Sequence, residues 1–376
     1  MDLHDLTPVV TAEGPFVTVL VDSESDVEQA ADKYDLEWKN VLKELESEGV
    51  DARTVEAVGA ARGEHAQGAA RLVIATVPDS TVRLAVSLVA PPRRPVVEVA
   101  ALPRLRPLVE DLTNRVPHVV VLADRTGADV AAYFDAEQVA KEVTVKGTQL
   151  HLKKVQVGGW AHHRYQHRAE DRWEKNAKLI AETVAQLVPQ VGAQLVVGVG
   201  DQRELQLVHE HLPTEQQTLW RELPGSRGQD GSEELVPQRV ADLLALHVAQ
   251  STLDLLAEYA QERGQQKRAC DGLADVVDAL RKAQVETLLI TTDTEEHGTL
   301  WFGPEPSVIA TTGRELIELG VEDPKEGPLV DVLIRAAVGT GAGVQLVPGE
   351  MEQAPQAGVG AVLRYADSLG SEAAAQ

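Results

Sequence analysis

The sequence predicts an α/β (α+β) protein built from three domains. The chain has 376 residues, which at about 150 residues per domain predicts two or three domains. Hydrophobic residues make up 43% of the chain, enough for sizeable cores. Short apolar runs alternate along the chain with segments in which apolar residues recur every three or four positions, as in amphipathic helices. This mixture of strand and helix patterns is the basis for the fold class.

The first domain is expected over residues 1–113. A polar helix is predicted there because Ala30, Tyr34, Trp38, Val41 and Leu45 recur at helical spacing. Its expected elements are strands at residues 16–21, 71–77, 82–89 and 96–100 and a helix at residues 26–48. Five prolines between residues 91 and 107 indicate a linker or edge segment. The boundary is therefore placed near residue 113.

The second domain is expected over residues 114–264 and the third over residues 265–376. The second should hold a strand, turn and strand at 118–134, a long helix at 161–187, a strand at 194–199, a helix at 202–211, an extended piece at 216–222 and a long helix at 236–263. The third should hold a helix at 270–283, strands at 286–291 and 344–347, short apolar pieces at 301–302 and 308–309, and a helix at 329–337. Alternation of helix and strand suggests a small α/β domain.

Charge is unevenly distributed. The formal net charge is -24, which repels nucleic acid overall and gives no reason to expect DNA binding. Residues 1–64 carry 16 acids and 5 bases, and residues 295–376 carry 13 acids and 4 bases. Residues 141–180, in contrast, carry 9 bases and 4 acids, with four of the 11 histidines and two of the five tryptophans. That basic segment is the expected contact surface.

The lone Cys270 excludes an intrachain disulfide, a cysteine-based zinc site and a CxxC redox pair. We expect Cys270 to lie in a helix and assign it no chemistry. The acidic start, Met1 to Leu6, lacks the features of a secretory signal, and no apolar run approaches about 18 residues. The expectation is a cytoplasmic protein that spans no membrane and needs no cofactor or metal.

Two stretches resemble the archaeal and eukaryotic class-I release factor superfamily, which includes Pelota. Residues 158–188 read GGWAHHRYQHRAEDRWEKNAKLIAETVAQLV, similar to that family's Gly-Gly-Gln loop and the arginine-bearing helix that follows it. Residues 279–293 read ALRKAQVETLLITTD, similar to the start of the family's third domain. The resemblance implies a three-domain, release-factor-like architecture with a decoding-site-like first domain and a GTPase-binding-like third domain.

Departures from the family pattern change the expected function. Trp160 stands where the family has its catalytic glutamine, and the Asn-Ile-Lys-Ser stop-codon motif is absent. Peptidyl-tRNA hydrolysis and stop-codon reading are therefore not expected. What remains resembles the bacterial branch that includes the ribosome hibernation factor Balon. That resemblance implies a non-enzymatic protein in the A site of idle ribosomes, near 16S and 23S rRNA, with a translational GTPase such as elongation factor Tu.

The Gly-Gly loop and the helix after it supply most of the expected RNA contacts. Glycines permit close backbone approach, and a tryptophan at a loop tip can stack on a base. Arg164, Arg168 and Arg172 follow one another at four-residue steps, and Lys175 lies one turn further on. The full set is Lys153, Lys154, Gly158, Gly159, Trp160, His162, His163, Arg164, His167, Arg168, Arg172 and Lys175. The alternatives are an ordinary turn, and a solvated helix with pairs such as Glu174 with Lys178.

His162, His163 and Arg164 also leave an enzymatic alternative open. Histidine can give and take protons near neutral pH, so these residues could serve a tRNA-directed nuclease or a peptidyl-tRNA hydrolase. No cysteine or nearby carboxylate completes a metal site around them.

Arg93, Arg94, Arg104 and Arg106 form a local basic group in the acidic first domain, with Glu98 as the one acid between residues 93 and 106. They are expected to contact 16S rRNA through its phosphates. The alternative is that they cover a Pro-rich domain joint.

Overall fold

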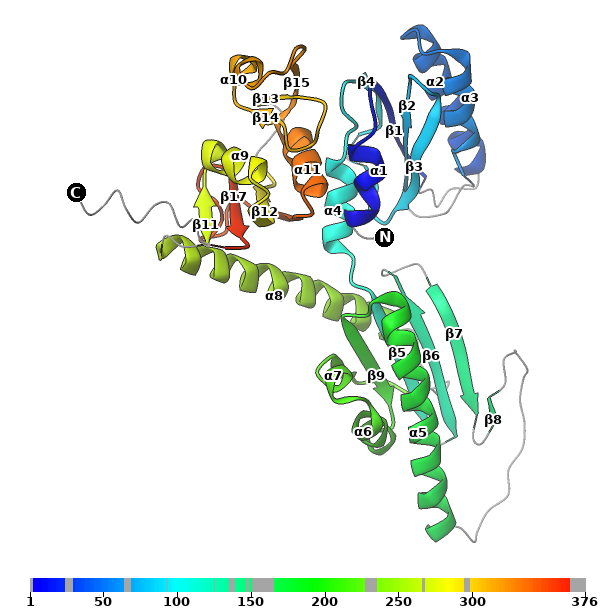
Figure 1. Ribbon diagram of the computed structural model, residues 1–376. Helices are drawn as coiled ribbons and strands as arrows, with labels where there is room; N and C mark the ends of the chain where they lie inside the picture. The colour runs from blue at the N-terminus through cyan, green and yellow to red at the C-terminus, as the bar shows by residue number, and fades with distance from the viewer. Residues whose placement is uncertain are drawn as a thin grey trace, which may run out of the picture. The chain divides into compact units, whose positions relative to one another are not determined.

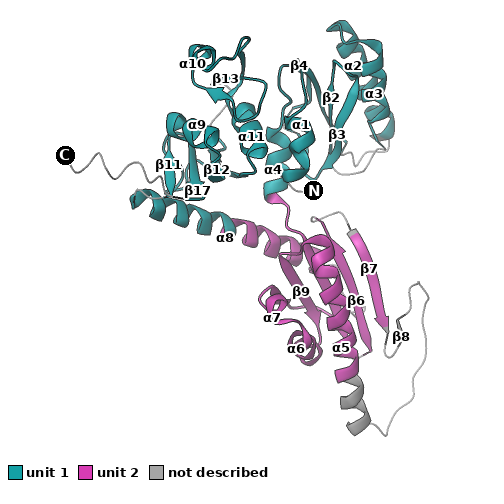
Figure 2. Ribbon diagram, in the orientation of Figure 1, with its two compact units in different colours: residues 1–113, 251–376 teal, residues 114–250 magenta. Residues whose placement is uncertain are grey.

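The computed structural model describes residues 3–23, 30–63, 69–92, 94–124, 126–134, 139–146, 149–150, 166–226, 235–265, 268–293 and 298–365. Its helices and strands mix throughout, which confirms the predicted α/β class. The chain divides into two compact units (Figure 2), one formed by residues 1–113 and 251–376 and the other by residues 114–250.

The N-terminal part of the first unit is a four-stranded antiparallel sheet in the order β3-β2-β1-β4. Its elements are η1 (Leu3–Leu6), α1 (Thr7–Val10), β1 (Phe16–Asp22), α2 (Ala30–Ser47), α3 (Ala52–Ala60), β2 (Ala70–Thr76), β3 (Thr81–Leu88), β4 (Val96–Ala100) and α4 (Arg106–Asn114). The predicted helical stripe is buried at Tyr34, Trp38, Val41 and Leu45. Together with α3 it packs on one face of this sheet.

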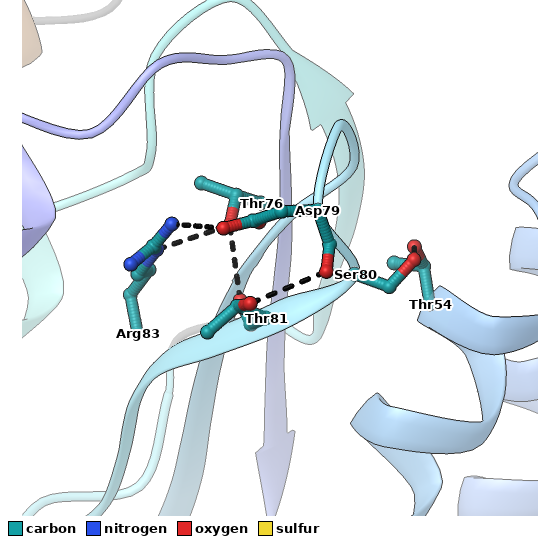
Figure 3. Close-up of polar contacts among 6 residues, drawn as sticks. All are labelled: Thr54, Thr76, Asp79, Ser80, Thr81 and Arg83. Atoms are coloured by element: carbon teal, nitrogen blue, oxygen red, sulfur yellow. Dashed lines mark hydrogen bonds and ion pairs between the residues drawn. The ribbon is translucent and has the colours of Figure 1, made fainter.

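The turn between β2 and β3 is held against the start of α3 by short polar side chains (Figure 3). Asp51 caps α3 by accepting the backbone N–H groups of Arg53 and Thr54. The Thr54 hydroxyl donates to Ser80 Oγ at 3.0 Å, and Ser80 lies in the left-handed region at φ 52°. On the other side of the turn, Asp79 accepts from Thr76 and forms an ion pair with Arg83. These bonds pair the polar side chains of the turn with groups of the same unit.

The C-terminal part of the first unit holds two sheets, in the orders β11-β17-β12-β16 and β14-β13-β15. Its elements are β11 (Ala269–Asp271), α9 (Leu273–Arg281), β12 (Val285–Thr291), β13 (Thr299–Phe302), β14 (Ile309–Ala310), α10 (Gly313–Glu318), β15 (Lys325–Pro328), α11 (Leu329–Gly339), β16 (Gly343–Val347) and β17 (Val359–Leu363). The larger sheet packs against α9 and α11 on one face and against the last turns of α8 (Val236–Gly264) on the other.

The predicted first and third domains share one hydrophobic core. Leu6, Val9 and Leu105 from the N-terminal part lie in the same buried cluster as Val332 and Leu333 of α11. Because this core joins segments more than 200 residues apart, residues 1–113 and 251–376 cluster as one unit, and the second boundary falls at 250/251 where 264/265 was expected. The other division between the two units falls at 113/114.

The second unit is a sheet with helices on both faces. The strand order is β10-β9-β5-β6-β7-β8, in which β10, β9 and β5 are parallel and the rest antiparallel. Its elements are β5 (His118–Asp124), β6 (Gly127–Tyr133), β7 (Val139–Lys146), β8 (Gln149–Leu150), α5 (Gln166–Val191), β9 (Leu195–Gly200), α6 (Gln202–His211), α7 (Thr214–Gln217) and β10 (Trp220–Leu223). Helices α5 and α6 cover one face and the first turns of α8 the other.

Two sequence-based assignments are wrong. Cys270 lies in the edge strand β11, which pairs with β17, and the helix begins only at Leu273. The piece predicted as extended at 216–222 starts in α7 and becomes a strand only at Trp220.

Helix α8 is long and apolar enough, by length and composition alone, to cross a membrane. Its ends contribute to protein cores through Val240 and Tyr259, for example.

Candidate nucleic-acid interface

Most of the predicted RNA-contacting loop lies outside the described residues. Lys153, Lys154, Gly158, Gly159, Trp160, His162, His163 and Arg164 fall within residues 151–165, and Arg93 also lies outside. The placement of these side chains stays a prediction. His167, Arg168 and Arg172 fall on the backbone of α5, but their side chains are not described either. Of the contact residues predicted in the loop and α5, Lys175 has a described side chain, and it is exposed.

Helix α5 is anchored along one side only. Ala177, Ala181 and Val184, all predicted for its apolar face, are buried in the core of the second unit, as is Ile180. At 100° per residue, Lys175 lies roughly opposite the middle of this buried stripe. Positions 168 and 172 precede Lys175 by seven and three residues, so the helix repeat places them on its side of the backbone. The helix therefore offers a polar side that packing leaves free at Lys175.

The start of α5 extends beyond the sheet (Figure 1). The helix has 26 residues, hence a length of about 39 Å. The neighbouring β9 has 6 residues, hence about 20 Å. Among the residues of α5 whose side chains are described, Glu174 and Lys175 are exposed and Asn176 is the first buried one.

An ion pair between Glu174 and Lys178 was the alternative that would make this part of α5 a solvated surface helix. Both side chains are exposed, and in the described part of α5 no ion pair joins them. Lys175 and Lys178 lie three residues apart, near one another on the helix surface. Two ammonium groups there are available to phosphate oxygens.

Acidic side chains lie at the end of the sheet from which α5 projects. Strands β5 and β9 are parallel, and α5 leads into β9 through three residues, so α5 starts near the carboxyl ends of both strands. Asp124 ends β5, and Asp201 follows β9 and caps α6 through the N–H groups of Arg203 and Glu204. The sequence analysis missed this group, although each acid directly follows or closely trails a predicted strand.

Glu204 is the buried member of that group. Its side chain is 2% exposed, and Oε1 has no hydrogen-bond partner among the described residues. Burial, with the neighbouring charges of Asp201 and Asp124, raises the pKa of its carboxyl to about 7. In the described part of the chain, no group of His, Cys, Asp and Glu side chains could hold a metal ion. The acids therefore leave the strand ends unfavourable for phosphate, while the bases of α5 favour it.

The predicted basic group of the first domain is engaged within its own unit. Arg104 Nε donates to Glu98 Oε2 at 2.6 Å, and Arg106 Nη2 donates to the carbonyl of Thr292 at 2.7 Å. Arg94 is exposed. These contacts of Arg104 and Arg106 agree with the alternative prediction, in which the arginines cover a Pro-rich domain joint and do not contact rRNA.

Comparison with known proteins gives three kinds of match. Residues 117–265 match the model of the bacterial archaeo-eukaryotic release factor family 2. An uncharacterized protein of Mycobacterium tuberculosis strain H37Rv is 28% identical over 375 residues, covering 96% of this chain and 97% of the relative. The strain CDC 1551 / Oshkosh carries a protein with the same identity and coverage.

Solved structures of release factors and Pelota also match along the chain. The archaeal translation termination factor aRF1 is 14% identical and covers 96% of this chain and 97% of its own, with a TM-score of 0.26. Archaeoglobus fulgidus Pelota is 15% identical and covers 96% and 91%, with a TM-score of 0.34. An archaeal Pelota described as ribosome-bound is 13% identical and covers 97% and 94%, with a TM-score of 0.41.

The matched residues 117–265 include the Gly-Gly loop, all of α5 and the sheet on which α5 packs. These are the parts in which the sequence resembles the release factors, and the superfamily predicted from them is confirmed. Over this middle region, the chain is similar to the bacterial archaeo-eukaryotic release factor family 2.

Proposed function

We propose that this protein binds the ribosome as a translation-factor-like protein and does not hydrolyse peptidyl-tRNA. The family match over residues 117–265 carries the proposal, because that region contains the loop and helix expected to enter the ribosome. The free, basic side of α5 at Lys175 and Lys178 supports it, since exposed ammonium groups on a projecting helix suit a phosphate-rich surface.

The absence of hydrolysis follows from Trp160. An amide side chain offers both a donor and an acceptor, whereas indole offers one N–H donor and no acceptor. Trp160 is therefore poorly suited to position a hydrolytic water in the place of the family's glutamine. An indole at that position suits stacking on an unpaired base, so the loop would occupy its site without chemistry.

A hibernation role refines this proposal. A protein that occupies the A site without reading a stop codon or releasing peptide would keep an idle ribosome closed to tRNA. In this proposal it lies near 16S and 23S rRNA in the cytoplasm and binds alongside a translational GTPase such as elongation factor Tu. Its support is the resemblance to the bacterial branch of the superfamily and the family match.

Sedimentation with purified 70S ribosomes tests the proposal. Trp160→Ala should weaken binding by about 1 to 3 kcal/mol, the range for loss of one base-stacking side chain. Leu246→Ala is a matched control, because it truncates a side chain that is 64% exposed in α8 of the described structure. Equal affinities of the parent and Trp160→Ala would contradict a stacking role for the indole.

Chemistry on stalled ribosomes separates the proposal from its enzymatic alternative. We expect intact tRNA and no peptide release after long incubation with the parent protein. Trp160→Gln alone should restore little hydrolysis, because His162 and His163 also depart from the family's small and aliphatic residues. Cleaved tRNA or released peptide that disappears in His162→Ala or His163→Ala would establish the nuclease or hydrolase instead.

A further inference from the structure

Helices α2 and α3 lie side by side (Figure 1), with a groove between them. Only residues 48–51 separate the two helices, so the helices run antiparallel. The groove has a volume of about 460 Å³, and its lining includes Trp38 and Leu42 of α2 and Val55 of α3. That volume lies in the range of ligand-binding sites, about 300 to 1,000 Å³. The groove thus offers apolar surface of sufficient size for an occupant.

A contact between the helices shows which residues face each other across the groove. A Cβ added at Gly59 would lie 3.3 Å from Leu42 Cδ1, so positions 42 and 59 are opposite. Lys39 lies three residues before Leu42. Arg62 lies three residues after Gly59, so the antiparallel register places it opposite Lys39. Both basic side chains line the groove and are exposed, so two bases face each other at one end of it.

Two acids face each other at the other end. Glu46 lies four residues after Leu42, and Glu56 lies three residues before position 59. Both acidic side chains line the groove, are exposed and make no ion pair with any described residue. Like charges that face one another repel, whereas a base opposite an acid is favourable. The arrangement is thus unfavourable for the helix pair alone and favourable for an occupant that brings the opposite charge to each end.

The basic end keeps a positive charge despite one ion pair. Arg62 Nη1 lies 2.9 Å from Asp35 Oδ1, and the two side chains are 44% and 48% exposed. An ion pair so exposed contributes little to stability and can exchange its carboxylate for another. Lys39 makes no ion pair with any described residue. The three side chains together leave one positive charge at this end of the groove.

The two charged ends select the class of occupant. Lys39 and Glu46 are seven residues apart on α2, hence about 10 Å along the helix. A nucleic acid or an anionic lipid would match only the basic end, and a metal cation only the acidic end. An α-helix of two turns spans the same distance and brings residues i and i+7 to the groove, with apolar residues i+3 and i+4 between them. Because the N-terminal end of a helix is positive, its dipole favours that end near the two glutamates.

We propose that the groove between α2 and α3 is a docking site for an amphipathic helix of a partner protein. The docked helix runs antiparallel to α2, with a base in its first turn facing the two glutamates and an acid two turns later facing Lys39 and Arg62. The net charge of the chain does not enter, because the groove uses both signs. The chain's own residues 366–376 contain two acids and no base, so they do not fit. This docking is independent of ribosome binding.

Two hydrocarbon-stapled helical peptides test the docking on the full-length protein. The first carries Lys in its first turn, Leu three and four residues later, and Glu seven residues later. The second has the same composition with Lys and Glu exchanged. Fluorescence anisotropy of the dye-labelled peptides should give at least about tenfold tighter binding for the first peptide, because the second brings like charges to both ends of the groove.

A variant with an inverted groove is the sharpest control. Lys39→Glu, Arg62→Glu, Glu46→Lys and Glu56→Lys together exchange the two charged ends and leave the net charge at -24. We expect the preference to invert, so that this variant binds the second peptide about tenfold more tightly than the first. An effect of the acidity of the whole chain would not respond to this change, because the total charge is the same.

Filling the groove tests its apolar part. Gly59→Leu adds a side chain toward Leu42 and should weaken binding of the first peptide by about tenfold or more. Ala60→Leu is the matched control, because it enlarges an exposed residue of α3 that does not line the groove, and it should leave the affinity unchanged. If Gly59→Leu melts at a lower temperature, the inverted variant decides, because its four substitutions are at exposed side chains.

Three results would overturn the docking proposal: no binding of either peptide, equal affinities for the two, or an unchanged preference in the inverted variant. Light scattering of the parent protein examines another occupant. A dimer that Gly59→Leu dissociates would show that a second copy of the chain fills the groove, and would overturn the proposal as well.

Discussion

Two buried carboxylates, one in each unit, meet opposite surroundings. Asp331, at the start of α11 in the first unit, is 3% exposed and accepts the N–H of Leu105 at 3.0 Å. Its other oxygen lies 3.9 Å from Arg104. Glu204, in the second unit, is 2% exposed, has an unpartnered Oε1 and is neighboured by the acids Asp201 and Asp124. The Asp331 carboxylate has a hydrogen-bond donor and a nearby cation. The described residues supply no donor to Glu204 Oε1.

The difference shows two uses of a buried polar group. Asp331 ties α11 to a residue 226 positions earlier in the chain, and burial raises its pKa only to about 6 against the lowering effect of the Leu105 N–H and Arg104. It joins the predicted first and third domains. Glu204 joins no distant segments, and its pKa of about 7 places its titration in the physiological range. Both carboxyls have raised pKa values, and the titration of Asp331, at about 6, lies below that of Glu204, at about 7.

The largest effect is expected at the joint of the first unit. Arg335 is 4% exposed and donates to the carbonyls of Val10, Gly303, Pro304 and Glu305. Arg335→Met should lower the free energy of unfolding by about 3 to 5 kcal/mol, because these buried carbonyls lose a charged donor. Urea denaturation measures it. Arg314→Met, at a side chain 87% exposed, is the control and should cost less than about 0.5 kcal/mol.

A smaller loss is expected at the strand end of the second unit. Gly200 has φ 139°, and an added Cβ would lie 1.8 Å from the carbonyl oxygen of Ala123. Gly200→Ala should destabilise the protein by about 3 kcal/mol through backbone strain and the clash. Gly192→Ala is the matched control, since it also has positive φ but nothing within 4 Å of the added Cβ. If urea denaturation shows equal losses of stability for the two variants, the positive φ, and not the clash with Ala123, causes the loss.

The pH dependence of stability tests the contrast between the two acids. Below about pH 4.5 both folded and unfolded states hold the Glu204 proton, and between 4.5 and about 7 only the folded state holds it. The free energy of unfolding should therefore fall as pH rises through this window. The contribution of Glu204 should be about 2 kcal/mol, allowing for partial solvation.

Glu204→Gln isolates that contribution from the one of Asp331, because Asp331 is present in both proteins. Urea midpoints measured from pH 4.5 to pH 8 should show the parent losing stability relative to the variant as pH rises. A constant difference across this range would mean that Glu204 has a partner and an ordinary pKa.

The smallest effect on stability is expected at Lys175, whose side chain is exposed. Lys175→Gln should change the free energy of unfolding by less than about 0.5 kcal/mol. If Lys175 contacts phosphate, ribosome binding should lose about one unit of its salt-dependence slope. Lys282→Gln, which removes an exposed base paired with Asp278 in the first unit, is the control. Equal salt slopes for the two variants would remove Lys175 from the interface.

The spacing of apolar residues along the chain was sufficient to predict the long helices and their buried faces. The four-residue stripe from Tyr34 to Leu45 predicted the buried face of α2, and Ala177, Ala181 and Val184 predicted that of α5. Strand β4 and helix α6 have the bounds expected from the sequence. These elements carry their own period of apolar residues, and burial on one face follows from that period.

Short and non-local elements needed the tertiary structure. Cys270 was placed in a helix because its neighbours continue a helical pattern, but pairing with β17, some 90 residues later, makes it part of a strand. Helices α3 and α10 and strand β17 had no pattern of sufficient length to predict them. Pairing partners distant in sequence override local propensity in such segments.

By itself, the sequence determined the mixed α/β class, the basic segment around α5 and the superfamily. The tertiary structure decided that the first and third predicted domains share one core, and that Arg104 and Arg106 make contacts within their own unit. It also placed Glu204 among acids at the strand ends. Composition and periodicity act over a few residues and are written in the sequence, whereas burial and pKa depend on which distant segments fold together.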